Sequence, residues 1–299
     1  MSIAAWRRTG LFALVLLLPF GKVSLVPTTA CAARADFVWR PASPKAGSLF
    51  RVATTARPVS ATRASGTTAV TATVAGEPLH FRVVGDSAFA IAAVPIDSTA
   101  GITMAWQCSG DTSGSVRIPT TAGTYRLERL RVAPRFGAPP DSVTATRMRL
   151  EAERAAQVSR SAHDTPRQWS LPFLVPRTSR ITSPFGGGRT FNGAVTSRHM
   201  GTDYAGAVGA PVRAANRGIV RLVDAFTLGG NVVYLDHGEG LVTAYLHLST
   251  QLVAVGDTVS RGDTIGRVGA TGRVTGPHLH FIARYGTITV DPAGLARQR

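Results

Sequence analysis

Histidines and one aspartate are the residues of this sequence whose types and spacing could do chemistry. The chain has seven histidines in 299 residues, and five of them fall between positions 199 and 280. His278 and His280 stand two apart in the stretch GPHLHF, and residues two apart on a strand project from the same face of a sheet. His199 and Asp203, four apart in SRHMGTDYAG, share one face in either a helix or a strand. In the histidine pair, one ring can bind a metal while the other stands beside it.

His247 lies in the run LVTAYLHL, whose alternation predicts a strand. One face is expected to be more polar and to border a cleft; it carries Leu241, Thr243, Tyr245 and His247. The other face is expected to pack inward; it carries Val242, Ala244, Leu246 and Leu248. Two histidines and one carboxylate are the ligand set of a catalytic zinc site, whose fourth position belongs to water. Zinc lowers the pKa of that water from about 15.7 toward 7, and further histidines can carry protons or stabilise an oxyanion.

This set of residues resembles the lysostaphin and LytM type of zinc metallo-endopeptidases, which hydrolyse peptide bonds in bacterial peptidoglycan. The resemblance covers roughly Ser179 to Ala293 and includes stretches such as GAPVRAANRGIV, GNVVYLDHGEGLVTAYLHLS and VTGPHLHF. Carried over by position, it implies one Zn²⁺ per chain. The implied zinc ligands are His199, Asp203 and His280, and the implied catalytic histidines are His247 and His278. Which of these two histidines accepts the proton and which stabilises the oxyanion is left open.

The resemblance implies an enzyme that cleaves peptide bonds in peptidoglycan stem peptides or cross-links by a water molecule that the metal activates. The same family includes members that have lost ligands. The alternative is therefore a catalytically silent module that binds the cell envelope or activates a cell-wall amidase, and the complete ligand set argues against it. A third reading, an exoprotease with a Gly-rich target, shares the chemistry and differs in substrate.

The elements that must position these residues are strands. We expect a mainly β chain with a signal peptide at 1–35, an immunoglobulin-like β-sandwich at 36–137, a short helical linker at 138–178 and an antiparallel β LytM-type peptidase domain at 179–299. Strands of five to eight residues separated by tight turns predict the antiparallel sheet, and no long helix is expected in it.

The front part consists of short β-type runs separated by Gly, Ser, Asp and Pro, which is typical of a sandwich. The stretch AGTYRLERLRV is expected to be its last strand. The following helix is expected to begin with Asp141 or Ser142 as its cap and to carry Met148, Leu150, Ala155 and Val158. His80 is interpreted as a strand residue, His163 as a structural residue at the helix end, and His237 as a turn residue without a catalytic role.

The first 35 residues are typical of an export signal, with Arg7 and Arg8 followed by the apolar run LFALVLLLPF. We favour cleavage before Asp36; lipidation at Cys31 is the alternative. Cleavage would leave Cys108 as a lone thiol. No later apolar run is long enough to span a membrane, so a mature protein in the periplasm or cell envelope is expected.

The formal net charge is +16. The arginine excess has two readings, a codon-usage bias or attraction to an anionic polymer. Nucleic acid fits an exported chain poorly, and no basic motif interleaved with aromatic residues is present, so an envelope polyanion such as peptidoglycan is the expected partner. A regulatory protein partner is compatible with the extra front domain.

Overall fold

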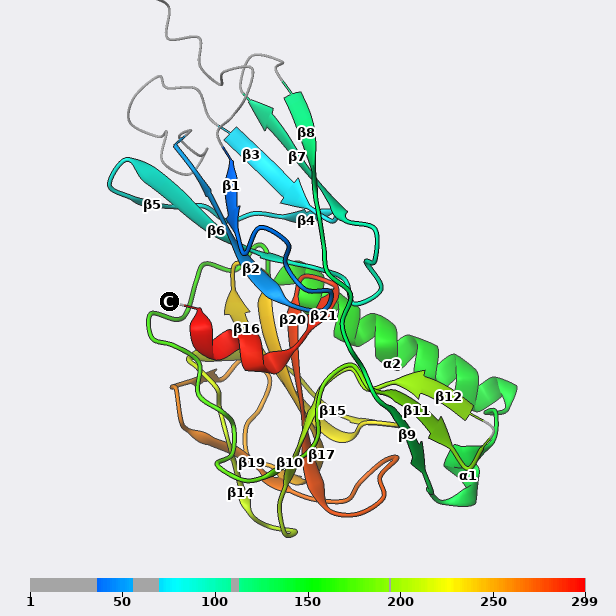
Figure 1. The fold of residues 1–299 in the computed structure, drawn as a ribbon. Coiled ribbons are helices and arrows are strands. Elements are labelled where there is room, and N and C mark those ends of the chain that lie inside the picture. The colour runs from blue at the N-terminus through cyan, green and yellow to red at the C-terminus, as the bar shows by residue number, and fades with distance from the viewer. Residues whose placement is uncertain (1–36, 56–69, 109–112, 194, 299) are drawn as a thin grey trace, which may run out of the picture.

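The computed structural model of the chain describes residues 37–55, 70–108, 113–193 and 195–298. The predicted signal peptide at 1–35 and the lipidation candidate Cys31 lie outside these residues. The described residues are mainly β, with two N-terminal sheets, one long helix and a larger C-terminal β domain (Figure 1). The expectation of a mainly β chain is therefore confirmed.

The N-terminal part contains two four-stranded sheets within the described residues, in the orders β1-β2-β6-β5 and β4-β3-β7-β8. Their strands are β1 (Val38–Arg40), β2 (Leu49–Thr54), β3 (Val70–Val74), β4 (Glu77–Pro78), β5 (Arg82–Val84), β6 (Ser87–Ala93), β7 (Ile102–Cys108) and β8 (Ser113–Ile118). Burial alternates along β3, as expected where one face of a strand lies on a core. Val52 of the first sheet and Met104 of the second belong to one hydrophobic cluster, so the two sheets pack against each other. Cys108 ends β7 and is buried, and the expectation of a lone thiol there concerns the chain after removal of residues 1–35.

The segment predicted as the last sandwich strand belongs to neither N-terminal sheet. It forms β9 (Leu127–Leu130), which pairs in parallel with β11 (Gly188–Phe191); β12 (Val195–Arg198) completes this sheet. The prediction is wrong because alternation indicates a strand, whereas tertiary contacts decide which strand it pairs with. The hydroxyl of Tyr125 still donates to the carbonyl oxygen of Ala46 at 2.7 Å, so this segment bridges the two halves of the molecule.

The predicted linker helix is present. The helices are α1 (Pro134–Gly137) and α2 (Ser142–Ser161). Asp141 caps α2, because its side chain accepts a hydrogen bond from the N–H of Thr144 at 2.7 Å. Ala155 and Val158 bury one side of α2 against the C-terminal sheet. Leu150 does not contribute to this buried side, as it is 53% exposed.

The C-terminal domain is built on a ten-stranded sheet whose main path runs β10-β13-β20-β17-β16-β15-β18. The strands are β10 (Ile181–Ser183), β13 (Thr202–Ala205), β14 (Pro211–Arg213), β15 (Gly218–Phe226), β16 (Gly230–Gly238), β17 (Leu241–Gln251), β18 (Thr258–Val259), β19 (Thr264–Val268), β20 (His278–Tyr285) and β21 (Ile288–Val290), followed by the 3-10 helix η2 (Pro292–Arg297). Every pairing in this sheet is antiparallel, as predicted. Across the described ranges, no helix is long and apolar enough to cross a membrane.

Strand β17 is buried on both faces, contrary to the expectation of one polar face. Tyr245 lies in the main core of the domain, and Leu246 lies in a second cluster beneath α2. Leu248 returns to the main core although it stands three residues after Tyr245, so the alternation breaks between them. His247 stands at the break, with a φ of 62° in the left-handed region that non-glycine residues seldom adopt.

Candidate metal centre

Three candidate ligands reach one point from two neighbouring strands and a loop. His199 lies on the connection between β12 and β13, Asp203 lies in β13, and His280 lies in β20. The antiparallel register of β13 and β20 places Asp203 directly opposite His280. Side chains that are directly opposite on adjacent strands share a face and have Cβ atoms about 4.5 to 5.5 Å apart. The sheet therefore brings together two residues that are 77 positions apart in the sequence.

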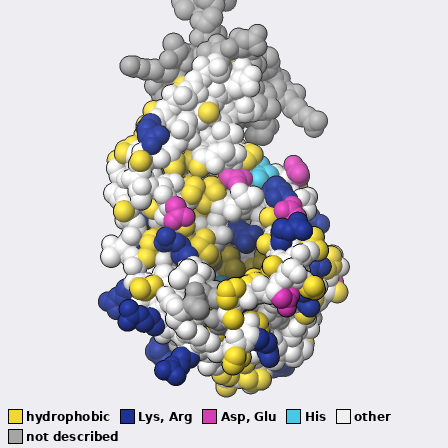
Figure 2. All heavy atoms as spheres, turned by 90° about the vertical axis from the view of Figure 1, so that its right-hand side faces the viewer, with side chains coloured by type: hydrophobic (Ala, Val, Ile, Leu, Met, Phe, Trp, Pro, Cys, Tyr) yellow, Lys and Arg dark blue, Asp and Glu magenta, His cyan; other side chains and the backbone are white. Residues whose placement is uncertain are grey.

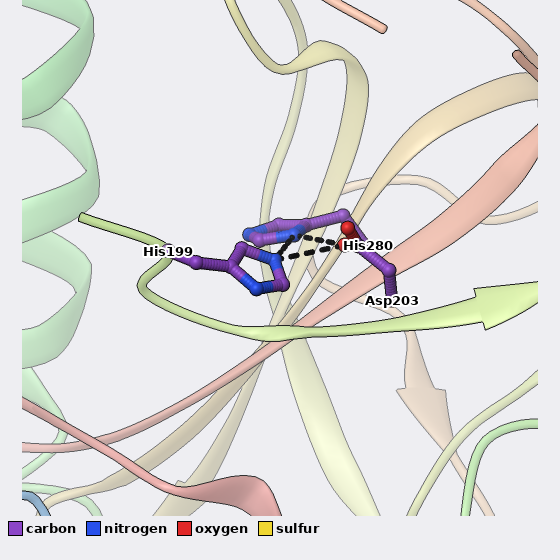
Figure 3. A group of neighbouring side chains, drawn as sticks. All are labelled: His199, Asp203 and His280. Atoms are coloured by element: carbon purple, nitrogen blue, oxygen red, sulfur yellow. Dashed lines mark hydrogen bonds and ion pairs between the residues drawn. The ribbon is translucent and has the colours of Figure 1, made fainter. Parts of the chain in front are cut away.

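The three side chains point toward one another (Figure 3). Nε2 of His199 lies 3.0 Å from Oδ1 of Asp203 and 3.0 Å from Nδ1 of His280. Nδ1 of His280 lies 2.7 Å from the same carboxylate oxygen, and all three residues are buried. A tetrahedral site with zinc bonds of about 2.0 to 2.1 Å separates its ligand atoms by roughly 3.4 Å. This triangle of atoms, which could hold a metal, needs its sides to lengthen by about 0.4 to 0.7 Å to match these separations.

The hydrogen bonds of His199 decide which of its ring nitrogens carries a proton. Nδ1 lies 2.8 Å from the carbonyl oxygen of Pro184. Because a carbonyl oxygen only accepts, Nδ1–H is the donor, and Nε2 of the neutral ring carries a lone pair. This lone pair and Oδ1 of Asp203 are two acceptors that face each other at 3.0 Å, and such a pair repels unless a cation or proton lies between them. The donor set therefore fits a divalent cation.

The second carboxylate oxygen of Asp203 is held from the opposite side. Oδ2 accepts a hydrogen bond from Nη2 of Arg189 at 2.7 Å, and Nε of Arg189 donates to Glu128 at 2.9 Å. Burial alone would raise the pKa of Asp203, but its close contacts with the His199 and His280 rings outweigh burial and hold this pKa well below its usual range. The carboxylate is therefore ionised and supplies a negative charge for a cation.

The two histidines expected to be catalytic lie beside the same centre. The Nδ1–H of His247 donates to the carbonyl oxygen of Thr271, and that of His278 donates to Gly276, both at 2.8 Å. Nε2 is thereby left as the acceptor in each neutral ring. Nε2 of His278 lies 3.7 Å from Oδ1 of Asp203, and the ring centroids of His247 and His278 are 4.9 Å apart. Both rings can accept a proton within a few ångströms of the three candidate ligands.

The backbone at His247 is unusual. A left-handed conformation at a non-glycine residue costs about 1 to 3 kcal/mol and often accompanies a functional position. It also turns the ring out of the strand's regular alternation, so that His247 lines the cleft with Asp203 and His278. Burial, and then the charges of His280 and His278, lower the pKa of His247 to about 3, which keeps its ring neutral at pH 7.

Several residues of the cleft were not found by sequence reasoning. The cleft has a volume of about 160 Å³, and its walls include Glu128, Arg189, Phe191 and Arg273. The guanidinium of Arg273 lies over the ring of Phe191 at 3.9 Å. Nearly all of the 33 Lys and Arg residues are arginines, so spacing does not single out these two. The parallel pairing of β9 with β11 would have been needed to place Glu128 here.

His237 lies in strand β16, so its interpretation as a turn residue is wrong, and it stands away from the centre, inside the core. Its Nδ1–H donates to the carbonyl oxygen of Arg217 at 2.7 Å, and its Nε2 lies 2.8 Å from the hydroxyl of Thr243. The side chain is fully buried, and this burial lowers its pKa to about 4. Its two ring nitrogens thus both have partners within the protein, which fits the interpretation that it has no catalytic role.

Comparison with known proteins finds a family match over the segment that carries the three candidate ligands. Residues 197–292 match the family described as peptidase family M23. The chain is 49% identical over 83 residues to the peptidoglycan DD-endopeptidase ShyC of Vibrio cholerae, a match that covers 28% of this chain and 19% of that protein. It is 42% identical over 119 residues to the DD-carboxypeptidase/endopeptidase Mpg of Neisseria meningitidis, which covers 40% and 27% respectively. The matches thus span less than a third of the length of either relative.

A solved structure extends the likeness beyond the family domain. A candidate peptidase M23 from Pseudomonas aeruginosa superposes with a TM-score of 0.61 at 23% identity, covering 85% of this chain and 95% of that chain. At this identity the likeness concerns the fold alone. It includes the N-terminal part as well as the domain that carries the candidate ligands, because residues 197–292 are a much smaller share of the chain.

Proposed function

We propose that this chain, whose residues 197–292 belong to peptidase family M23, is a zinc metallo-endopeptidase that hydrolyses peptide bonds in peptidoglycan. The observation that carries the proposal is the triangle of His199, Asp203 and His280, in which two ring nitrogens and a carboxylate oxygen converge at 2.7 to 3.0 Å. These three residues would hold one Zn²⁺ per chain. When bound, zinc lowers the pKa of a water molecule and polarises a carbonyl group.

His247 and His278 supply the proton chemistry in this proposal. Because both rings donate Nδ1–H to backbone carbonyl oxygens, proton transfer occurs at Nε2. One ring accepts the proton of the attacking water at Nε2 and then delivers that same proton to the leaving amine. The other ring enters the reaction with a proton on Nε2 taken from solvent, donates it in a hydrogen bond to the developing oxyanion, and keeps it. Backbone carbonyls hold both rings in place, so little reorientation is needed during the reaction.

Peptidoglycan is the proposed substrate, and its stem peptides or cross-links are the bonds cleaved. Two relatives of this domain are named peptidoglycan DD-endopeptidase and DD-carboxypeptidase/endopeptidase. The strongly basic chain suits an anionic polymer. Figure 2 shows Lys and Arg side chains spread over one face of the molecule around a central hollow, with fewer Asp and Glu among them.

We further propose how the rest of the chain serves this domain. Residues 1–35 act as a signal peptide and direct the protein to the periplasm or cell envelope, with a lipid anchor at Cys31 as the less favoured alternative. Residues 36–137 form an immunoglobulin-like β-sandwich, 138–178 form a linker and 179–299 form the peptidase domain. The two packed four-stranded sheets support the assignment of a sandwich. Strand β9 lies within residues 36–137 but pairs with β11 of the peptidase domain.

Zymography of the purified protein on peptidoglycan tests this function. We expect zinc-dependent clearing, and we expect mass spectrometry of digested, chemically defined muropeptides to identify the cleaved bond. An exposed helix variant, Arg149→Gln, serves as a control and should clear as the parent does. Stoichiometric zinc without any clearing would favour the alternative, a silent module that binds the envelope or activates an amidase.

A further inference from the structure

A second cavity lies between the N-terminal sheet β1-β2-β6-β5 and the C-terminal domain. Its volume is about 380 Å³, larger than that of the cleft at the metal centre. Its walls come from β2, β5 and β6 on one side and from Arg167, Trp169, Leu241 and Tyr285 on the other. Leu241 precedes His247 by six residues on β17, which corresponds to roughly 20 Å along a strand. The cavity is therefore separate from the metal centre.

The charges around this cavity are unbalanced. Arg51, Arg82 and Arg167 line it, while Glu239 is the only carboxylate among its described lining residues. Burial, and then the nearby charges of Arg82 and Arg51, lower the pKa of Arg167 to about 10. Glu239 pairs with Arg167 at 3.8 Å, which leaves three guanidinium groups against one carboxylate, so an anion in the cavity would relieve the remaining repulsion.

Donor groups around the cavity lack acceptors. Nη2 of Arg167 and Nε1 of Trp169 are buried and have no hydrogen-bond partner among the described residues. The guanidinium of Arg167 stacks on the Trp169 ring at 3.1 Å, which fixes its orientation. The guanidinium of Arg82 also donates no hydrogen bond within the described part of the chain. Buried donors without acceptors are uncommon in folded proteins, and a carboxylate would satisfy guanidinium donors in pairs.

The same cavity has an apolar side. Val84 and Phe89 line it and are 65% and 42% exposed, although both are large hydrophobic residues. Ile91 and Leu241 continue this apolar lining inward. Exposed hydrophobic residues next to donors that converge on one point are typical of small-molecule sites. The ligand should therefore combine a negative charge with an apolar group.

A chain of hydrogen bonds presents an acceptor to the cavity. His80 lies between β4 and β5 and not within a strand, so its interpretation as a strand residue is wrong. Glu77 accepts from Nε2–H of His163 at 2.9 Å, so Nδ1 of His163 must accept from Nε2–H of His80 at 2.8 Å. Burial is the main cause that lowers the pKa of His80 to about 4, so its ring is neutral at pH 7. Nδ1 of His80, which lines the cavity, is therefore an acceptor and suits an N–H group.

We propose that this cavity binds an organic anion in which a carboxylate is joined to an apolar group and an amide N–H. An N-acyl amino acid has this chemistry, and so does the carboxyl-terminal residue of a polypeptide. The carboxylate meets Arg51, Arg82 and Arg167, while the apolar group lies against Phe89. The proposal does not depend on zinc or on hydrolysis, because no residue of the cavity belongs to the metal centre.

Isothermal titration calorimetry with the full chain tests the proposal. The probes are N-acetyl-L-phenylalanine, its carboxamide, inorganic phosphate, and a hexapeptide that ends in phenylalanine. We expect saturable binding of a carboxylate probe and at least roughly tenfold weaker binding of the carboxamide and of phosphate, because a charged hydrogen bond is lost or the apolar contact is missing. If N-acetyl-L-phenylalanine binds, a small free acid is a sufficient ligand. If only the hexapeptide binds, the ligand is the carboxyl-terminal end of a polypeptide.

Two matched arginine variants locate the site. Arg82→Gln removes a guanidinium without breaking any hydrogen bond of the described residues, and it should weaken carboxylate binding roughly tenfold. Arg149→Gln makes the same charge change on the exposed surface of α2 and should leave binding unchanged. Absence of carboxylate binding, equal binding of the carboxamide or phosphate, or an unaltered affinity in Arg82→Gln would each overturn the proposal.

Discussion

Two groups of histidines lie toward opposite ends of strand β20 and differ in how their lone pairs are matched. In the first, the acceptor nitrogen Nε2 of His199 faces the acceptor oxygen Oδ1 of Asp203 at 3.0 Å. In the second, His80 donates to His163, which donates to Glu77, and every contact pairs one donor with one acceptor. The contact between His199 and Asp203 is unfavourable without a cation between the two acceptors, whereas the contacts within the second group need none. The balance of donors and acceptors thus separates a metal centre from a structural network.

Burial does not make this distinction. His237 is 0% exposed and His199 is 2% exposed, yet His237 is a structural residue and His199 is a candidate metal ligand. His237 satisfies both of its ring nitrogens with a carbonyl oxygen and a hydroxyl. A buried histidine whose neighbours are acceptors alone is therefore the informative case.

The largest expected effect is the loss of metal from the first group. His280→Ala should abolish zinc binding and lower hydrolysis of a muropeptide by at least about 10³-fold, because one of three proposed ligands is gone. His237→Ala should keep stoichiometric zinc, although it should unfold at lower temperature because its cavity and lost hydrogen bonds destabilise the core. Elemental analysis of dialysed protein measures the zinc content. A His280→Ala protein that keeps stoichiometric zinc and full activity would show that the first group of histidines is not a metal centre.

A second substitution separates metal binding from proton transfer. His278→Ala should retain zinc and lose activity by about 10² to 10⁴-fold, the usual range for a lost general acid or base. The matched change His80→Ala, in the second group, should leave hydrolysis within about twofold of the parent. Elemental analysis and muropeptide turnover, measured on the same samples, give both quantities. Loss of zinc from His278→Ala would mean that His278 is a ligand and not a proton carrier.

Sequence reasoning found the centre more readily than its surroundings. His278, His280 and Asp203 follow local rules, because two-residue spacing and strand pairing bring them to one face. His247 was placed on a regular strand, but its left-handed backbone breaks the alternation, and sequence carries no reliable signal of such a conformation at a histidine. Glu128 was assigned to the front domain because the partner of a strand depends on contacts that lie far away in the sequence.

Acid should weaken the folded state through His237. Its pKa is about 4 when folded and about 6.5 when unfolded, so the unfolded chain binds more protons between these values. This contribution is fully present above pH 6.5 and is lost as the pH falls toward 4. It amounts to about 3 kcal/mol. Urea unfolding measures the free energy of unfolding at pH 7 and at pH 4. The decrease between these two pH values should be about 3 kcal/mol smaller in His237→Gln than in the parent protein. An identical drop in parent and variant would contradict the assignment.

The smallest expected effect concerns the support of the first group by Arg189. Its guanidinium holds Oδ2 of Asp203 at 2.7 Å, so that Oδ1 stays directed at the two histidines. Arg189→Gln should lower zinc affinity by about 10 to 100-fold, the usual cost of losing a partner that orients a metal ligand. Arg198→Gln is the control, because Arg198 pairs with Asp97, which is largely exposed, and such surface pairs contribute little.

Competition with a chelator measures zinc affinity, and turnover at saturating zinc then separates two roles of Arg189. If Arg189 only orients Asp203, excess zinc should restore most of the activity of Arg189→Gln. Unchanged zinc affinity together with lost turnover would instead place the guanidinium on the substrate, as its position in the wall of the cleft allows. Glu128→Gln sharpens the result, because Glu128 holds Arg189 from β9 without touching Asp203. A weaker version of the same zinc defect in Glu128→Gln would show that the strand from the front of the chain helps to set the metal centre.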